Sequence, residues 1–133
     1  MRAKVGRIMQ PKSPSISFVI SKLAERNMLP AIYFIFSRRG CDKAIDNIKD
    51  LTLVSYSEAN MISQKLDVYL KNNQEAIKDK SQCEALKRGI ASHHAGLLPA
   101  WKELVEELFQ QGLIKVVFAT ETLAAGILSL INI

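Results

Sequence analysis

The stretch from residue 90 to residue 126 constrains the fold of this 133-residue chain more than any other part of its sequence. Its centre is an amphipathic helix with Pro99 in the first turn, where proline is well tolerated, and Gly112 after the last turn, where a left-handed cap favours glycine. The apolar residues of this helix follow a helical spacing and form one stripe: Trp101, Leu104, Val105, Leu108 and Phe109. We expect this stripe to form the core of the chain.

Apolar segments flank this helix on both sides. Residues 113–119, which follow it, form an almost unbroken apolar run with two valines, as in a strand covered on both faces. Strand, helix and strand in this order predict a βαβ unit with a right-handed crossover and parallel strands. The polar clusters at residues 93–96 and 120–122 then lie at the carboxyl ends of neighbouring strands, the edge where open α/β sheets bind ligands.

The first half of the chain predicts a second strand-to-helix unit. Residues 31–36 are apolar, aromatic and β-branched, which is typical of a strand. A helical stripe follows in Cys41, Ala44, Ile45 and Ile48. Further helices are predicted at residues 16–27 and around residues 73–88. Another helix is predicted between them, with Ser57 as its N-cap. The predicted fold is α/β with helices on both faces of a mostly parallel sheet, whose strands lie near residues 31–36, 89–94 and 114–119.

The net charge of +5 is concentrated near the N-terminus. Five of the 18 basic residues and none of the 13 acidic ones lie in residues 1–24, so 13 of each sign remain from Glu25 onward. Such a segment could bind a polyanion, or it could be a solvated leader or linker. Its serines and its lack of acids also faintly resemble an organelle transit peptide. The basic residues of the segment are Arg2, Lys4, Arg7, Lys12 and Lys22.

Composition excludes some classes of protein. The sequence contains no run of about 18 apolar residues, so it predicts no membrane span. Cys41 and Cys83 lie far apart without metal-ligand spacing, so we expect both to be reduced and buried in an intracellular protein.

Three motifs occur in a fixed order at the predicted strand ends: FIFSRR at residues 34–39, HHAGLLP at residues 93–99 and FATETLAAGI at residues 118–127. Together they resemble motifs of superfamily 2 DExH-box RNA helicases, and most closely those of the superkiller-like branch in its plant and cyanobacterial form. The resemblance implies a RecA-like three-layer domain, the second of two motor domains. It divides the chain into a basic arm (1–15), a partial motor domain (16–127) and a divergent apolar tail (128–133).

The resemblance implies that all three motifs face the cleft between the two motor domains and the bound strand. It implies that Ser37 and Arg38 approach the backbone of the RNA. It implies the same for His94 and Gly96, where a small residue lets that backbone come close. Structural alternatives remain open: Arg38 and Arg39 as a solvated pair at a helix start, and the two histidines as one packed and one exposed residue. A zinc site at adjacent histidines without a nearby cysteine is a poor interpretation.

The third motif is implied to contact phosphate and nucleotide. Thr120 and Thr122 would offer hydroxyl and N–H donors to a phosphate near a helix start, and Gly126 would lie beside the nucleotide. Contacts of this kind read backbone and shape rather than base sequence. The two threonines could instead cap the following helix. Glu121 has no partner carboxylate or nucleophile that would support a role as a general base, so no catalytic residue is predicted.

Motifs that are absent bear on activity. The sequence contains neither G-x-x-x-x-G-K-[ST] nor D-E-x-H, so the P-loop lysine and magnesium carboxylates are missing. The family carries these on its first motor domain, and its arginine fingers lie beyond the third motif. After Ile127 the family usually continues with Asn and a Met-Pro or Leu-Pro pair, whereas residues 128–130 read LSL. This departure suggests a truncated, alternatively spliced or mispredicted product. Because the P-loop and D-E-x-H are missing, we expect the isolated chain not to hydrolyse ATP and not to bind ATP, Mg²⁺ or another metal tightly.

The parent activity implied by the resemblance is ATP-dependent RNA unwinding, with ATP and Mg²⁺ as cofactors. One alternative is a non-enzymatic RNA- or helicase-binding module, such as a decoy or truncated isoform. A nucleotide-binding α/β enzyme of another kind would need a glycine-rich first turn, and SRRG at residues 37–40 is not one. The expected partners are single-stranded RNA and the first RecA-like motor domain, with no membrane. The compartment suggested by the resemblance is the chloroplast, and otherwise the cytoplasm or nucleus.

Overall fold

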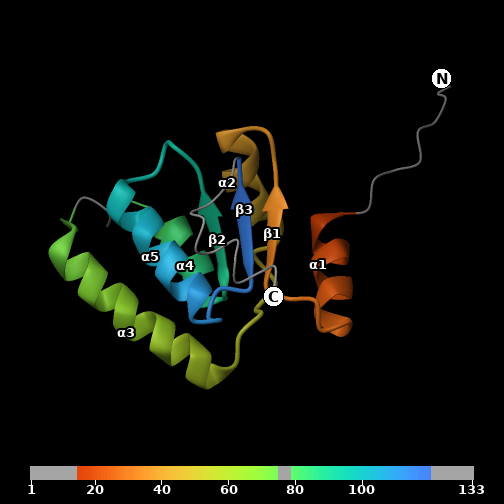
Figure 1. Cartoon of the computed structure of the whole chain (residues 1–133), viewed down its shortest axis with the longest axis horizontal. Helices are drawn as coiled ribbons and strands as arrows, with labels where there is room; N and C mark the ends of the chain where they lie inside the picture. The colour runs from red at the N-terminus through yellow and green to blue at the C-terminus, as the bar shows by residue number, and fades with distance from the viewer. Residues whose placement is uncertain (1–14, 75–78, 121–133) are drawn as a thin grey trace, which may run out of the picture.

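Three parallel strands form the centre of the fold. The structure is a computed structural model that describes residues 15–74 and 79–120. Its strands β1 (Ala31–Phe34), β2 (Ile90–His93) and β3 (Val116–Ala119) pair in the order β1-β3-β2. In the register, Ala119 lies opposite both Phe34 and His93, so all three strands end at the same level. The three arrowheads in Figure 1 accordingly point to one edge of the sheet.

The predicted sheet is confirmed in its strands and direction, and each strand is shorter than predicted. The ladder continues for one residue past β1, because the Ile35 N–H donates to the Ala119 carbonyl oxygen at 2.9 Å. Phe36, which was predicted to lie in the strand, is instead 99% exposed.

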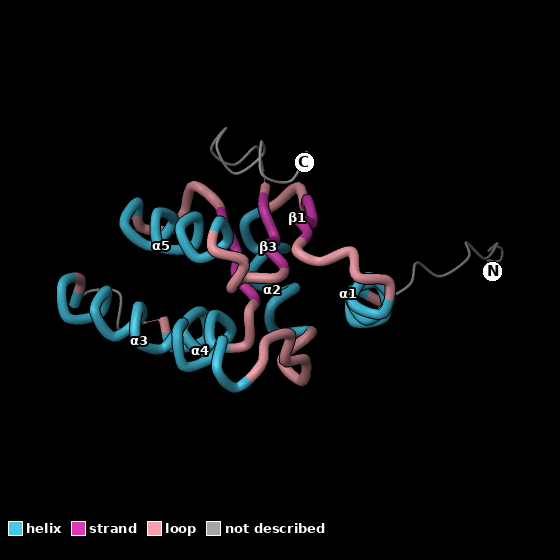
Figure 2. The backbone as a smooth tube through the Cα atoms, turned by 60° about the horizontal axis from the view of Figure 1, so that its bottom comes forward, coloured by secondary structure: helices cyan, strands magenta, loops and turns pink. Residues whose placement is uncertain are grey.

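Helices cover both faces of this sheet (Figure 2). In β3, Val116 and Phe118 pack in a core cluster with α1 and α2, whereas Val117 and Ala119 pack in a second cluster with α3 and α5. This alternation is the period of two expected of a strand buried on both faces. The α/β class is therefore confirmed, and the three strands form part of a RecA-like sheet. The helices are α1 (Ile16–Glu25), α2 (Arg38–Asn47), α3 (Tyr56–Asn72), α4 (Lys80–Lys87) and α5 (Pro99–Gln110).

Helix α5 has the predicted limits and the predicted buried face. Pro99 is its first residue, and all five residues of the predicted stripe are buried. After the helix, Gly112 adopts a φ of +76°, where L side chains are strained. The N–H groups of Gly112 and Leu113 donate to the carbonyl oxygens of Phe109 and Leu108 at 3.0 and 2.9 Å, which satisfies two carbonyls at the helix end.

The prediction that Ser57 caps a helix is wrong, because the cap is Ser55. The Glu58 N–H donates to Ser55 Oγ at 3.2 Å, and the Ser55 N–H donates to Glu58 Oε1 at 2.9 Å, which forms a capping box. Glu58 also accepts from Lys115 Nζ at 3.0 Å, so the first turn of α3 is tied to the residue before β3. The backbone hydrogen bond from Ser55, followed by the bond from Lys115, lowers the pKa of Glu58.

We expect Ser55→Ala to lower the free energy of unfolding by about 1 kcal/mol, because the Glu58 N–H loses its acceptor. Ser57→Ala is the matched control, since Ser57 lies in the first turn of the helix and is not its cap. Its Oγ lies 3.3 Å from Ser55 Oγ, an exposed contact whose loss leaves the cap in place, so stability should change by less than about 0.5 kcal/mol. Urea unfolding followed by circular dichroism measures both. Equal losses in the two variants would contradict the assignment of the cap.

Other predictions for this region are refined. The polar helix predicted at residues 73–88 is observed as α4 with Asp79 as its cap, and residues 75–78 lie outside the described part. Both cysteines are free, as expected, but only Cys41 is buried and Cys83 is partly exposed. No helix within residues 15–74 and 79–120 is long and apolar enough to cross a membrane.

Candidate nucleic-acid interface

The carboxyl ends of the three strands form one surface, which we call the strand-end edge: residues 36–39 after β1, residues 94–96 after β2, and Thr120 after β3. The parallel register places these segments side by side, because Phe34 and His93 both pair with Ala119. The edge therefore contains Ser37, Arg38, His94, Gly96 and Thr120. The other residues implied by the resemblance, Thr122 and Gly126, lie outside the described residues, as does Glu121.

Ser37 turns the chain from β1 into α2. It is the N-cap of the helix, and its Oγ accepts from the Gly40 N–H at 2.9 Å. A Cβ at position 40 would lie 2.7 Å from both Ser37 Oγ and Ile35 Cγ2, so a side chain there would displace the turn. Within the described part of the chain the Ser37 hydroxyl is engaged only as an acceptor, and the residue is exposed. Its own proton can therefore be donated to an acceptor such as a phosphate oxygen.

Arg38 and Arg39 begin α2 and are both exposed. No residue in the described ranges forms an ion pair with either guanidinium. Arg38 lies over the segment that follows β2, since a Cβ at position 96 would come within 3.4 Å of Arg38 Cδ. The same Cβ would come within 3.1 Å of the His94 ring. Gly96 therefore lets Arg38 and His94 come together from different elements.

His94 is held by hydrogen bonds to both ring nitrogens. Its Nδ1 accepts from the Gly96 N–H at 3.1 Å, so the ring proton of the neutral form lies on Nε2. Nε2 then donates to Asp42 Oδ1 at 3.0 Å. The side chain is 5% exposed, so the ring positions the backbone of residues 94–96 from inside the protein.

Asp42 is the residue of this site that the motifs did not reveal. Its Oδ1 accepts from Gln82 Nε2 at 3.0 Å and lies 3.1 Å from Ser92 Oγ, in addition to the bond from His94. Gln82 and Ser92 are buried. One carboxylate oxygen thus links α2, α4 and β2 directly beneath the strand-end edge. The one local signal was its position four residues after Arg38, on the same side of a helix.

His93 is also buried, which corrects the alternative of one packed and one exposed histidine. Its Nε2 lies 2.7 Å from Glu106 Oε2 of α5, and the side chain is 10% exposed. The described residues contain no cluster of His, Cys, Asp and Glu that could hold a metal ion. The two neighbouring histidines therefore point to different carboxylates, one in α5 and one in α2.

Cys41 lies in α2 next to Asp42 in the sequence and is fully buried. Burial, with a smaller contribution from the negative charge of Asp42, raises the pKa of its thiol to about 11. Burial also raises the pKa of Cys83. Because the thiolate is the nucleophilic form, neither cysteine is prepared for catalysis near neutral pH.

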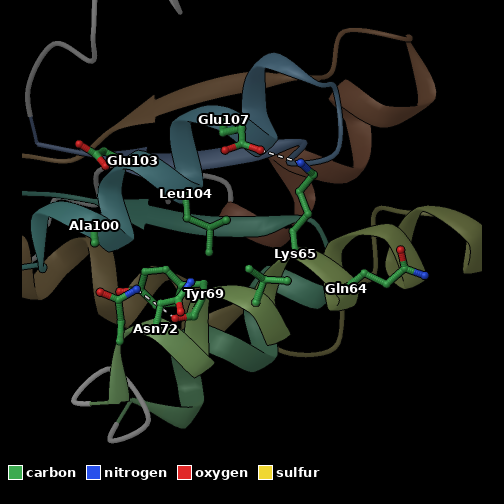
Figure 3. A pocket seen from close by; sticks show the side chains of 10 residues that line it. Gln64, Lys65, Tyr69, Asn72, Ala100, Glu103, Leu104 and Glu107 are labelled. Atoms are coloured by element: carbon green, nitrogen blue, oxygen red, sulfur yellow. Dashed lines mark hydrogen bonds and ion pairs between the residues drawn. The ribbon is translucent and has the colours of Figure 1, made fainter.

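A cavity of about 460 Å³ lies away from these residues, between α3 and α5 (Figure 3). Its wall includes the ion pair between Lys65 Nζ and Glu107 Oε2, 2.7 Å apart, and the apolar side chains of Val68 and Leu104. None of the described residues implied by the three motifs lines it. The site supported by the motifs is therefore the open strand-end edge and not this cavity.

The fold and the edge together define a class of protein: a RecA-like α/β domain with polar and basic groups at its strand ends. Over 93% of its length the chain is 46% identical to the DExH-box ATP-dependent RNA helicase DExH15, chloroplastic, of Arabidopsis thaliana. It is 45% identical over 87% of its length to the probable helicase HelY of Mycobacterium tuberculosis, and 36% identical over 82% to the antiviral helicase SKI2 of Saccharomyces cerevisiae. No protein-family model matches the chain.

The chain belongs to the superkiller-like DExH-box RNA helicases, as a fragment related to one segment of them. It spans about a tenth of the length of the relatives it matches, with 10% of DExH15, 14% of HelY and 9% of SKI2 covered. The fragment thus corresponds to a small part of each relative.

Proposed function

We propose that this chain is the RNA-contacting part of a second motor domain from an ATP-dependent RNA helicase. The observation that carries the proposal is the shared level of the three strand ends, which gathers Ser37, Arg38, Gly96 and Thr120 on one surface. Two guanidinium groups that have no ion-pair partner among residues 15–74 and 79–120, together with two hydroxyls, suit a phosphodiester backbone, to which RNA-binding proteins direct many of their contacts. His94 contributes by holding residues 94–96 in place.

In a complete helicase this surface would face the first RecA-like domain, with RNA and nucleotide between them. Thr122 and Gly126 are proposed to extend the contact toward phosphate and nucleotide. The compartment proposed from the name of DExH15 is the chloroplast. The alternative proposal is a non-enzymatic module that binds RNA or a helicase by itself, as a decoy or truncated isoform. RNA binding without ATP turnover in this chain fits both proposals.

We expect the purified chain to show no ATP turnover above a buffer blank. Its sequence has no P-loop lysine and no D-E-x-H carboxylates, so nothing supplies the usual groups that hold the β- and γ-phosphates and Mg²⁺. A coupled phosphate-release assay with and without RNA measures this. Reproducible turnover that is lost in Thr120→Ala would contradict the expectation.

We expect weak, sequence-tolerant binding to single-stranded RNA from two sources, the basic arm and the strand-end edge. Deleting residues 1–14 should reduce the dependence of affinity on salt, since each neutralised phosphate contributes a slope of about −0.7 in log K against log salt, and should leave a residual affinity. In that background, Arg38→Ala with Thr120→Ala should remove the residual affinity.

The matched control is Arg26→Ala with Thr52→Ala, which makes the same chemical changes away from the strand-end edge. Arg26 is the C-cap of α1, before β1, and Thr52 lies in the loop that follows α2. This control should bind as the arm-deleted chain does. If deletion of the arm alone abolishes all binding, the strand-end edge is not an RNA site in this chain.

A further inference from the structure

We infer that Phe36 is a base-stacking residue for single-stranded RNA, an inference that rests on the proposed function of the strand-end edge. Phe36 lies directly before Ser37 and Arg38, and its side chain is 99% exposed. A phenylalanine in full contact with water forfeits the free energy that burial would provide. None of residues 15–74 and 79–120 covers the ring, so packing within this part of the chain does not explain its place on the edge.

The course of β1 shows why the ring is not part of the core. Tyr33 and Ile35 pack against the cluster formed with α1 and α2, and Ile32 packs against the cluster on the opposite face. Among the described residues the last hydrogen bond of the ladder is that of the Ile35 N–H, and Phe36 follows it. The turn into α2 follows at once, because Ser37 caps the helix.

The surroundings of Phe36 favour a nucleic acid over a protein as the partner. The three residues after it offer one hydroxyl and two exposed guanidinium groups, and residues 34–41 contain no acidic residue. An aromatic ring beside cationic groups is the arrangement by which proteins hold single strands, with phosphates on the charges and bases stacked on the ring. Every base has a π-face, so this contact would add affinity without sequence preference.

A second exposed aromatic residue provides a matched control. Tyr56 is 84% exposed and begins α3. The bond between Lys115 and Glu58 places this turn near the amino end of β3, opposite the strand-end edge. Replacing Tyr56 removes a similar exposed ring without touching the proposed site.

The test compares two ligands on the full chain: a short oligouridine and an oligomer of the same length with the same ribose-phosphate backbone and no bases. Fluorescence anisotropy measures both affinities. Phe36→Ala should weaken oligouridine binding at least about fivefold, the low end of the effect of removing an aromatic stacking partner. It should leave binding of the abasic oligomer unchanged. Phe36→Trp should retain the affinity, and Tyr56→Ala should alter neither.

Three outcomes would overturn the inference. If Phe36→Ala weakens binding of both ligands equally, or of neither, the ring does not stack on bases. The proposed function still stands in that case as long as the Arg38 and Thr120 variants lose affinity. If Phe36→Leu binds oligouridine as well as the parent chain, the contact is apolar and not aromatic. If Phe36→Ala leaves RNA binding intact and abolishes self-association in sedimentation, the ring belongs to a protein interface. Failure of the parent chain to bind either ligand would reject the proposed function itself.

Discussion

Leu108→Ala should lower the free energy of unfolding by about 2–5 kcal/mol, the range seen when a fully buried leucine is truncated in a close-packed core. Leu108 is 0% exposed and belongs to the cluster that joins α3, α5 and β3. Its neighbours are held by two other elements, so they cannot close the space that the missing methyl groups leave. Chemical unfolding with circular dichroism as the readout measures the loss.

Gln110→Ala serves as the control, since Gln110 lies on the exposed face of the same helix two residues further on. It should change the free energy of unfolding by less than about 0.5 kcal/mol. A loss of that small size for Leu108→Ala would show that α5 does not pack by the stripe seen in the structure.

Asp42→Ala should lower the free energy of unfolding by about 2 kcal/mol, because it leaves the buried donors of Gln82 and His94 without their acceptor. The estimate is modest for two bonds, since the Asp42 side chain is 48% exposed and water can take part of its place. RNA affinity should also fall, because His94 then no longer holds Gly96 in a fixed position. Thermal unfolding and the RNA titration measure the two effects.

The histidine ring provides a readout that a general loss of stability would not change. In the parent chain, ¹⁵N spectra should show His94 with its proton on Nε2, and Asp42→Ala should mix the two tautomers. Asp46→Ala is the matched control one turn along α2, where the carboxylate accepts only from Ser81 Oγ among the described donors, at 3.3 Å. If Asp42→Ala is as stable as Asp46→Ala and keeps the tautomer, Asp42 does not position His94.

Much of the fold followed from local patterns. The signals for α5 lie close together in the sequence: its apolar stripe, Pro99 at its start and Gly112 after its end. The apolar run of β3 follows directly. The order of helix and strand then predicted the parallel pairing with β2. The cap of α3 is an exception: S-x-x-E from Ser55 to Glu58 is itself a local capping signal, whereas the prediction placed the cap at Ser57.

The candidate site was predictable in its motifs and not in its internal contacts. Asp42 and His94 are 52 residues apart in the sequence, and nothing local indicates that they share a hydrogen bond. The role of Gly96 was understood in part, because a small residue was expected where RNA comes close. The structure adds that the missing Cβ makes room for His94 and Arg38. The exposure of Phe36 was unpredictable for another reason, since an apolar residue at the end of an apolar strand predicts burial.

Mapping bound RNA residue by residue tests the central claim that the strand-end edge is the RNA-contacting surface. The measurement is a titration of the ¹⁵N-labelled chain without residues 1–14 with single-stranded RNA, followed through its amide resonances. We predict that the largest shifts occur at Ser37, Arg38, Gly96 and Thr120, and that Thr52 and Tyr56 at the opposite edge do not shift. Shifts confined to the cavity between α3 and α5, or no shifts at any RNA concentration, would contradict this account.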